Sequence, residues 1–492
     1  MARKNTRRTQ GQHVESASVS AARALPSVDE LARDADLLAS AATLGDFPRQ
    51  VLIQAIRETL AAARAQAVSG MPIPDRIHLI EQITAAVANQ SQPSLRRVVN
   101  ATGVILNTNL GRAPLADAAI QAITSVARGY SNLEYDLADG MRASRMAHIR
   151  HWLRMLTGAE DALVVNNNAA AILLTLAALA SGRDVIISRG ELVEIGGGFR
   201  IPDVLRQSGA HLIEVGTTNR TYLRDYAEAI THETAAILLV HPSNFRLVGF
   251  TTSPALSELV ALAHSHDVPL IHDLGSGAVM PTERWGLAHE PTVQESIAAG
   301  ADLVCFSGDK LMGGPQAGII AGAASALAMI EHHPLVRAVR IDKLTLVALE
   351  ATLRLQAQGS AVHDIPVWSM ISMSIAEIEV RAKKWAEEWD AVLRPRGLEA
   401  TILPGESTVG GGSLPGETLP TVLCGVRPHT AALRLSPSQV TSVTTLAADL
   451  RRGQPAIVAR LSRDLLLFDP RTVSRDEDGL LLSAIRQALA RA

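Results

Sequence analysis

The chain has 492 residues, of which 47% are hydrophobic and 19% are charged, and its formal net charge is −3. This size predicts a globular protein of two or three domains, and no apolar run approaches the roughly 20 residues of a membrane span. The charge balance excludes a global basic field for nucleic acid, and Cys305 and Cys424 lie in apolar runs outside any Cys/His cluster, so we expect reduced thiols, no metal site and a cytoplasmic location.

The N-terminal quarter divides into two parts. Residues 1–25 carry five Lys or Arg against one Glu among Ser, Gln and Thr, which predicts a disordered basic tail, with an organellar transit peptide as the competing interpretation. Residues 26–95 predict a small helical domain, because apolar side chains recur at helical spacing on both sides of the interruption at 71–74.

From residue 158 onward, short apolar runs alternate with amphipathic stretches. This alternation predicts an α/β fold with parallel strands, right-handed crossovers and helices on both faces of the sheet. A smaller α/β domain with a linking helix is expected over 346–492. The predicted strands are 162–165, 184–187, 211–215, 235–240, 268–271, 303–306 and, as an edge strand, 318–321.

Polar residues follow two of these predicted strands. Asp273 comes after the strand at 268–271, and Lys310 lies in a glycine-rich turn after the strand at 303–306. Ligands of open α/β sheets sit beyond the carboxyl ends of the strands. A lysine there can form a Schiff base and an aspartate can hold a pyridinium nitrogen, so we interpret the pair as a pyridoxal phosphate (PLP) site. The alternative is a structural lysine in a turn.

Four blocks carry a resemblance to a known family, from about residue 96 to the C-terminus. GELVEIGG, EVGTTNRT, DLGSG and SGDKLMGGPQAGII together resemble bacterial L-seryl-tRNA(Sec) selenium transferases, the selenocysteine synthases. The resemblance implies a fold-type I PLP-dependent transferase with a seven-stranded, mostly parallel sheet. It also implies a PLP-binding catalytic domain over 96–345, tRNA binding by 26–95, and a homodecamer built from dimers. For 26–95, simple packing or oligomer contact remains an open alternative.

The activity that this resemblance implies is conversion of L-seryl-tRNA(Sec) to L-selenocysteinyl-tRNA(Sec) with selenophosphate, through a PLP-bound dehydroalanyl intermediate. Lys310 would carry the cofactor and act as the base, and an ionised Asp273 would keep the pyridine nitrogen protonated. Asp309 would transfer a proton or orient a group, unless it only caps its turn.

The resemblance also assigns cofactor-binding residues. Asn167, Asn168 and Ala169 would hold the PLP phosphate. They lie between a strand end and the start of a helix, whose free backbone N–H groups suit an anion. Ser307 would add a hydroxyl to that phosphate, and Asn244 would bond the phenolic oxygen. Whether Glu191 or Glu194 touches the cofactor stays open, since most glutamates in such loops are solvated.

Three arginines are implied as the site for the anionic selenium donor. Arg112 precedes a predicted helix. Arg337 and Arg340 are three residues apart, so they share one face if their segment is helical. We expect this helix to continue through 345–355. A guanidinium binds two phosphate oxygens at once. The alternatives are loop-capping contacts for Arg112 and a solvated basic face for the other two.

Three rival functions can be compared with this one. A PLP-dependent lyase acting on a small amino acid or amino sugar phosphate could share the catalytic core, but should not require the extra N-terminal region. A cysteine desulfurase is rejected, because neither cysteine lies in an exposed-looking catalytic loop. A non-catalytic RNA-binding scaffold would not need to retain Lys310, Asp273, Ser307 and the arginines.

Overall fold

The computed structural model describes residues 25–91, 93–195, 199–429 and 441–491. The chain divides into two compact units, Met1–Arg97 and Val98–Ala492. Apart from Leu25, the basic tail predicted for residues 1–25 lies outside the described residues. Within the described ranges, the search for a helix long and apolar enough to cross a membrane finds none.

The first unit is helical, as predicted. Ser27 and Asp34 cap its two short helices through their side-chain oxygens, which accept backbone N–H groups of the first turn. Leucine and isoleucine side chains at helical spacing, among them Leu60 and Ile83, form its core. Its helices are α2 (Val28–Leu31), α3 (Ala35–Ala42), α4 (Arg49–Val68) and α5 (Arg76–Ser91).

The second unit contains the predicted seven-stranded sheet, in the order β2-β10-β9-β8-β7-β3-β6. All its strand pairs are parallel except the two made by β10, so the predicted mostly parallel sheet is confirmed. The strands are β2 (Asp161–Val165), β3 (Asp184–Ser188), β6 (His211–Val215), β7 (Thr234–Val240), β8 (Leu270–Gly275), β9 (Leu303–Ser307) and β10 (Gly318–Gly322).

The prediction that residues 318–321 form an edge strand is wrong. β10 lies inside the sheet, antiparallel to both β2 and β9, and all five of its residues are buried. A Cβ atom at Gly318 would lie 2.1 Å from the carbonyl oxygen of Asn167. The strand can therefore insert between its neighbours because it begins with a residue that has no side chain.

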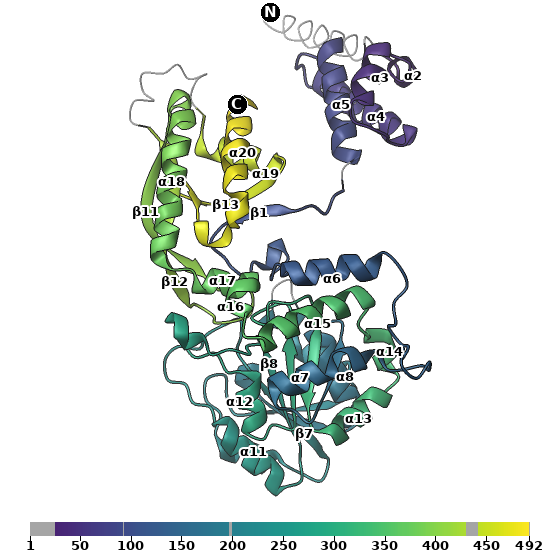
Figure 1. The fold of residues 1–492 in the computed structure, drawn as a ribbon, viewed down its shortest axis with the longest axis vertical. Coiled ribbons are helices and arrows are strands. Elements are labelled where there is room, and N and C mark those ends of the chain that lie inside the picture. Colours follow the sequence, from purple (N-terminus) through teal and green to yellow (C-terminus); the bar gives the residue numbers. More distant parts are fainter. Residues whose placement is uncertain (1–24, 92, 196–198, 430–440, 492) are drawn as a thin grey trace, which may run out of the picture. The chain divides into compact units, whose positions relative to one another are not determined.

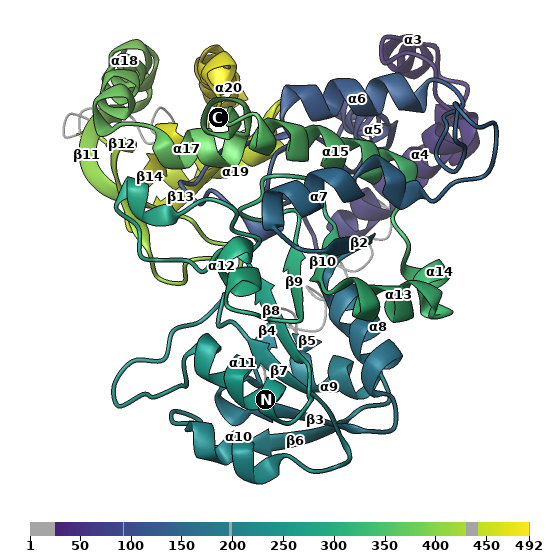
Figure 2. The same cartoon turned by 60° about the horizontal axis from the view of Figure 1, so that its bottom comes forward.

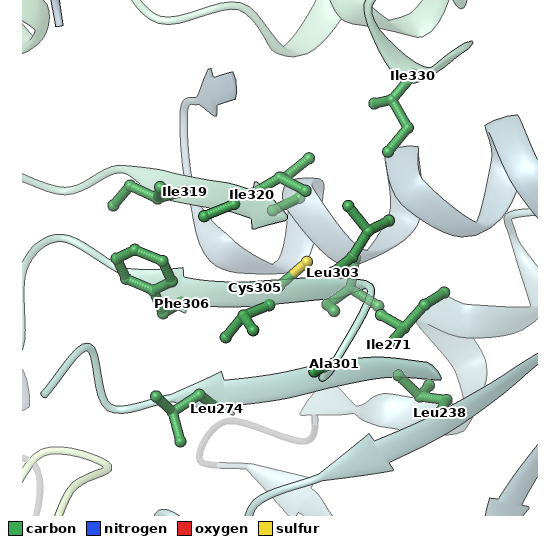
Figure 3. Packing of buried hydrophobic residues seen from close by; sticks show 14 of the residues in the cluster. Leu238, Ile271, Leu274, Ala301, Leu303, Cys305, Phe306, Ile319, Ile320 and Ile330 are labelled. Carbon is green, nitrogen blue, oxygen red and sulfur yellow. The ribbon is translucent and has the colours of Figure 1, made fainter. Parts of the chain in front are cut away.

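Helices cover both faces of this sheet. Figure 2 shows α8 and α9 on one side of the strands and α11 and α12 on the other. Leu238, Ile271, Cys305 and Ile320 come from four adjacent strands and are fully buried in one core (Figure 3). The helices around the sheet are α6 (Asp117–Ala127), α7 (Arg150–Thr157), α8 (Asn168–Ala180), α9 (Ile201–Arg206), α10 (Leu223–Ala229), α11 (Leu256–Ser265), α12 (Val293–Ala298), α13 (Ala324–His332), α14 (Leu335–Val339) and α15 (Lys343–Ala357).

A second, five-stranded sheet has the order β1-β13-β14-β12-β11. Its strand β1 comes from the N-terminal end of this unit and pairs in parallel with β13. α18 runs along β11 and β12 (Figure 1), and its Trp385 and Trp389 are fully buried in the core of this layer. The elements are β1 (Val98–Ala101), α16 (Ala361–Asp364), α17 (Pro366–Ser372), α18 (Ile375–Leu393), β11 (Leu398–Thr408), β12 (Thr418–Pro428), α19 (Val443–Arg452), β13 (Ala456–Ser462), β14 (Leu465–Phe468) and α20 (Asp478–Arg491).

Candidate active site

Lys310 follows β9 at the carboxyl edge of the large sheet, where β2, β7 and β8 also end. Burial lowers the pKa of the Lys310 amine, and the charge of Arg112 lowers it further. Three carboxylates act in the opposite direction, and they belong to Asp273, Asp309 and Glu290. The lysine therefore stands at the centre of a group of charges drawn from separate loops, which is typical of a reactive amine.

Asp273 lies near the end of β8 and is held by a side chain from the neighbouring helix. Asn168 donates its amide Nδ2–H to Asp273 Oδ1 at 2.8 Å. Burial raises the pKa of Asp273, while the Asn168 amide and the Lys310 charge oppose that rise. The other amide atom, Asn168 Oδ1, is buried without a hydrogen-bond partner among the described residues. The structure thus orients the carboxylate predicted for a pyridinium nitrogen.

Arg112 and Asp309 form an ion pair beside the lysine. The distance from Arg112 Nη1 to Asp309 Oδ2 is 2.9 Å, and the Ala113 N–H donates to the Asp309 carbonyl at 3.3 Å. Arg112 has a φ of 62°, a left-handed conformation that costs a non-glycine residue about 1 kcal/mol. The loop therefore holds the guanidinium against the residue next to Lys310 at a conformational cost, a pattern that favours function over simple packing.

The N-terminus of α8 provides the backbone donors predicted for a phosphate. Asn167 caps the helix by accepting the Ala170 N–H at 2.9 Å. The N–H groups of Asn168 and Ala169 belong to the first turn and have no intrahelical acceptor. Ser307, at the end of β9, is 4% exposed. The backbone at this helix end is therefore free to bind an anion, while the Asn168 side chain is engaged with Asp273.

The contact expected between Asn244 and the phenolic oxygen of PLP stays a prediction. Asn244 is exposed in the loop after β7. Its neighbour Ser243 lies near the lysine, since a Cβ atom on Gly275 would meet Ser243 Oγ at 3.3 Å and Lys310 Nζ at 3.8 Å. The loop after β7 therefore brings the Ser243 hydroxyl to the side of Gly275 on which the lysine amine lies.

Arg337 and Arg340 do not share a helical face. α14 ends at Val339, and Arg340 is extended, with a ψ of 143°, because residues 339–340 pair with the end of β2. A new helix, α15, begins at Lys343 under the cap of Asp342, so the predicted continuous helix is broken. Arg340 Nη1 lies 3.6 Å from Glu134 Oε1. Arg337 is exposed, and among the described residues no carboxylate pairs with it.

The two glutamates left open by the sequence have different environments. Glu191 Oε2 accepts the Val240 N–H at 2.8 Å, and burial raises the pKa of Glu191 to about 8. Glu194 is exposed and lies 2.9 Å from Arg200. Glu191 is therefore not one of the solvated loop glutamates that its sequence context suggested, and it supports the end of β7.

Three residues near Lys310 or Asp273 were not predicted from the sequence. His241 follows β7, Glu290 lies on an irregular loop before α12, and a Cβ atom at Gly412 would lie 2.8 Å from Lys310 Nζ. His241 follows the carboxyl end of a strand, a position that makes a residue a candidate for ligand binding. Glu290 carried no such signal, and the glycine run around Gly412 gave no indication of its distant contact.

Comparisons with known proteins fit this geometry. The sequence pattern described as L-seryl-tRNA selenium transferase matches residues 98–474. The chain is 48% identical over 453 residues to the L-seryl-tRNA(Sec) selenium transferase of Geotalea uraniireducens, covering 91% of this chain and 95% of that one. It is 45% identical over 473 residues to the protein of the same name from Nitratidesulfovibrio vulgaris, covering 95% and 98%.

Among solved structures, D-glucosaminate-6-phosphate ammonia-lyase is similar, with a TM-score of 0.54 and 24% identity over 81% of this chain and 97% of that one. At this level of identity the likeness concerns the fold, which is that of the fold-type I PLP enzymes. The sequence relatives are far more similar and span nearly the whole length. The chain belongs to the L-seryl-tRNA selenium transferase family.

Proposed function

We propose that this protein converts L-seryl-tRNA(Sec) into L-selenocysteinyl-tRNA(Sec), with PLP carried by Lys310 and selenophosphate as the selenium donor. The observation that supports this most directly is the Lys310 amine, whose pKa is lowered by burial beside Asp273, a carboxylate oriented by Asn168. The names of the relatives supply the substrate, a seryl-tRNA, and the transfer of selenium.

The residues present fit a PLP cofactor. A lysine amine, a carboxylate on β8 and the open amides of α8 match the aldehyde, pyridine nitrogen and phosphate of that group. Asn168 Oδ1 is a buried polar atom without a partner among the described residues, as expected beside a polar group that completes the site.

When bound, PLP supplies an electron sink that acidifies the α-proton of the seryl group. Lys310 removes that proton from Cα, and its lowered pKa increases the fraction of neutral amine available as a base. Asp273 holds a proton at the pyridine nitrogen. Asp309 orients the Arg112 guanidinium at 2.9 Å. The Lys310 ammonium that results from the α-proton transfer delivers its proton to the departing β-hydroxyl, which leaves as water.

The selenium donor is an anion, and we assign it to arginines. Arg112 lies beside the lysine and binds the donor phosphate with two N–H groups. Arg337 and Arg340 are exposed on the segment after α13, and they complete the donor site if that segment meets the substrate or a second chain.

The remaining assignments concern the larger partners. We assign contact with the tRNA to the helical region 26–95, which falls within the compact unit Met1–Arg97. We assign the reaction to residues 96–345 and a smaller C-terminal domain to 346–492. We further propose a homo-oligomer built from dimers, with a decamer as the expected size. Light scattering of the purified protein measures that size directly.

A spectroscopic titration tests the function. The visible spectrum of the PLP-loaded protein is recorded while seryl-tRNA(Sec) is added, with free serine as the control, and selenophosphate turnover is then measured. A band shift with the charged tRNA alone, followed by selenocysteinyl-tRNA(Sec) formation, is the expected result. A shift with free serine or another small amine would instead favour the small-molecule lyase.

A further inference from the structure

Glu290 is a buried carboxylate that none of the roles above uses. It is 2% exposed and lies on the loop between η4 (Thr282–Trp285) and α12. Its Oε1 atom lies 3.2 Å from His241 Nε2, and its Oε2 atom accepts the Leu414 N–H at 3.4 Å. A carboxylate is rarely buried so deeply unless it is paired or accepts hydrogen bonds, so these two contacts indicate which groups Glu290 positions.

The first contact leads to the cofactor side of the site. The backbone N–H of His241 donates to the backbone carbonyl of Asp273 at 2.9 Å, which fixes the histidine next to the strand that carries Asp273. Neither His241 Nε2 nor Glu290 Oε1 has a hydrogen bond of good geometry among the described residues, although the two atoms face each other. The two atoms lie 3.2 Å apart, so each is the polar partner nearest to hand for the other, and the pair restricts the orientation of the imidazole.

The second contact leads to the loop between β11 and β12. Gly412 has a φ of 83° and lies so close to Lys310 that a Cβ atom would be 2.8 Å from Nζ. Leu414, two residues on, donates its N–H to Glu290. A second anchor lies beside this one, since Glu417 Oε2 accepts the Ala288 N–H at 2.9 Å. The loop before α12 therefore holds the glycine loop 410–417 at two points.

These contacts connect the two sheets of the second unit at the reactive amine. We propose that Glu290 is a positioning residue, which holds the His241 imidazole and the glycine loop 410–414 against Lys310. Its role in the reaction rests on the proposed function, whereas its grip on the loop does not. The five-stranded sheet thus contributes to the site through a loop whose backbone restricts the space around the lysine.

The test compares Glu290→Gln with Glu283→Gln. The control removes the same charge from an exposed pair, in which Glu283 Oε1 lies 2.6 Å from His289 Nδ1. Hydrogen exchange of the peptide containing 410–414 is measured without cofactor. The pH dependence of Lys310 acylation by acetic anhydride, which loses acetate to the attacking amine, is read by peptide mass spectrometry. Three other charged groups act on this lysine, Arg112, Asp273 and Asp309, and all stay unchanged.

In Glu290→Gln we expect exchange of the loop to rise about threefold to tenfold, the range of one lost hydrogen bond. The midpoint of Lys310 acylation should move to lower pH, because a carboxylate that favours the ammonium form is gone. With the loaded enzyme, kcat should fall about tenfold at an unchanged KM for seryl-tRNA(Sec). Glu283→Gln should change none of these.

If Glu290→Gln does not fold, Glu417→Gln replaces it, because that change loosens the same loop at its second anchor. It should raise exchange of 410–417 and leave the acylation midpoint in place. Unchanged loop exchange in either folded variant would overturn the proposal. A wild-type protein that transfers no selenium, but whose loop still loosens in Glu290→Gln, would refute the proposed function and leave the positioning role standing.

Discussion

The lysine site and the segment carrying Arg337 and Arg340 differ in how their charges are held. Around Lys310, each charged group contacts a residue from another strand or loop, as Asp273 does with Asn168 at 2.8 Å. Arg337 and Arg340 are exposed, and the nearest carboxylate to Arg340, from Glu134, lies 3.6 Å away. Exposed pairs of this kind contribute little to stability. The comparison separates a fixed centre, formed by Lys310 and the charged groups that act on it, from an outer segment that carries Arg337 and Arg340.

Replacing the lysine tests the fixed centre most severely. Lys310→Ala removes both the covalent attachment point and the base, so we expect selenium transfer to fall by about four orders of magnitude or more. Single-turnover conversion of seryl-tRNA(Sec) measures the loss. A variant within tenfold of wild type would mean that the chemistry lies elsewhere and that the buried charges serve structure alone.

Replacing one arginine from each region tests the difference between the fixed centre and the outer segment. Arg112→Ala should raise KM for selenophosphate and lower kcat/KM about a hundredfold, because it removes a bidentate anion contact and leaves Asp309 unpaired. Arg340→Ala should cost only about tenfold, since its side chain is more exposed. Steady-state kinetics at varied selenophosphate separate the two. Equal losses would show that the outer segment is as much a part of the donor site as Arg112.

The sequence placed the inner site well because its residues belong to short contiguous blocks. Strand ends converge on one edge of a parallel sheet, so the positions of Asp273 and Lys310 followed from two apolar runs. The assignment of Asn168 to the phosphate concerns its backbone and stays a prediction, whereas the contact of its side chain with Asp273 was not predicted. Which way a side chain turns at a helix end depends on neighbours from another strand, and local sequence does not contain that information.

Contacts between distant segments could not be predicted. Gly412 lies about a hundred residues from Lys310 in the chain, on a loop of the other sheet, and no periodic pattern links them. β10 was expected at an edge, yet a glycine start lets it enter between β2 and β9. Both outcomes were decided by close packing between elements rather than by the properties of one segment.

A methyl group added to the glycine loop tests whether this loop restricts the space around Lys310. Gly412→Ala places a Cβ atom 2.8 Å from Lys310 Nζ, so the lysine must shift, and we expect kcat to fall about tenfold. Gly416→Ala is the matched control, because its φ of 76° carries the same backbone strain while its nearest neighbour, Arg246 Nη1, is 3.9 Å away. Turnover of both variants is compared at matched fold stability. Equal losses would mean that strain in the loop, and not contact with the lysine, limits the reaction.

The smallest expected effect concerns stability and comes from Glu191. Burial raises the pKa of Glu191 from 4.5 to about 8 in the folded protein. Between these two values the unfolded chain has released the proton that the folded protein retains, so stability falls as pH rises through this window and levels off above about 8. Glu191→Gln carries no such proton and should remove at least about 1 kcal/mol of this fall. Unfolding midpoints of the two proteins at pH 5 and pH 8 measure the difference. Identical pH profiles would place the Glu191 carboxylate in contact with water rather than buried against the end of β7.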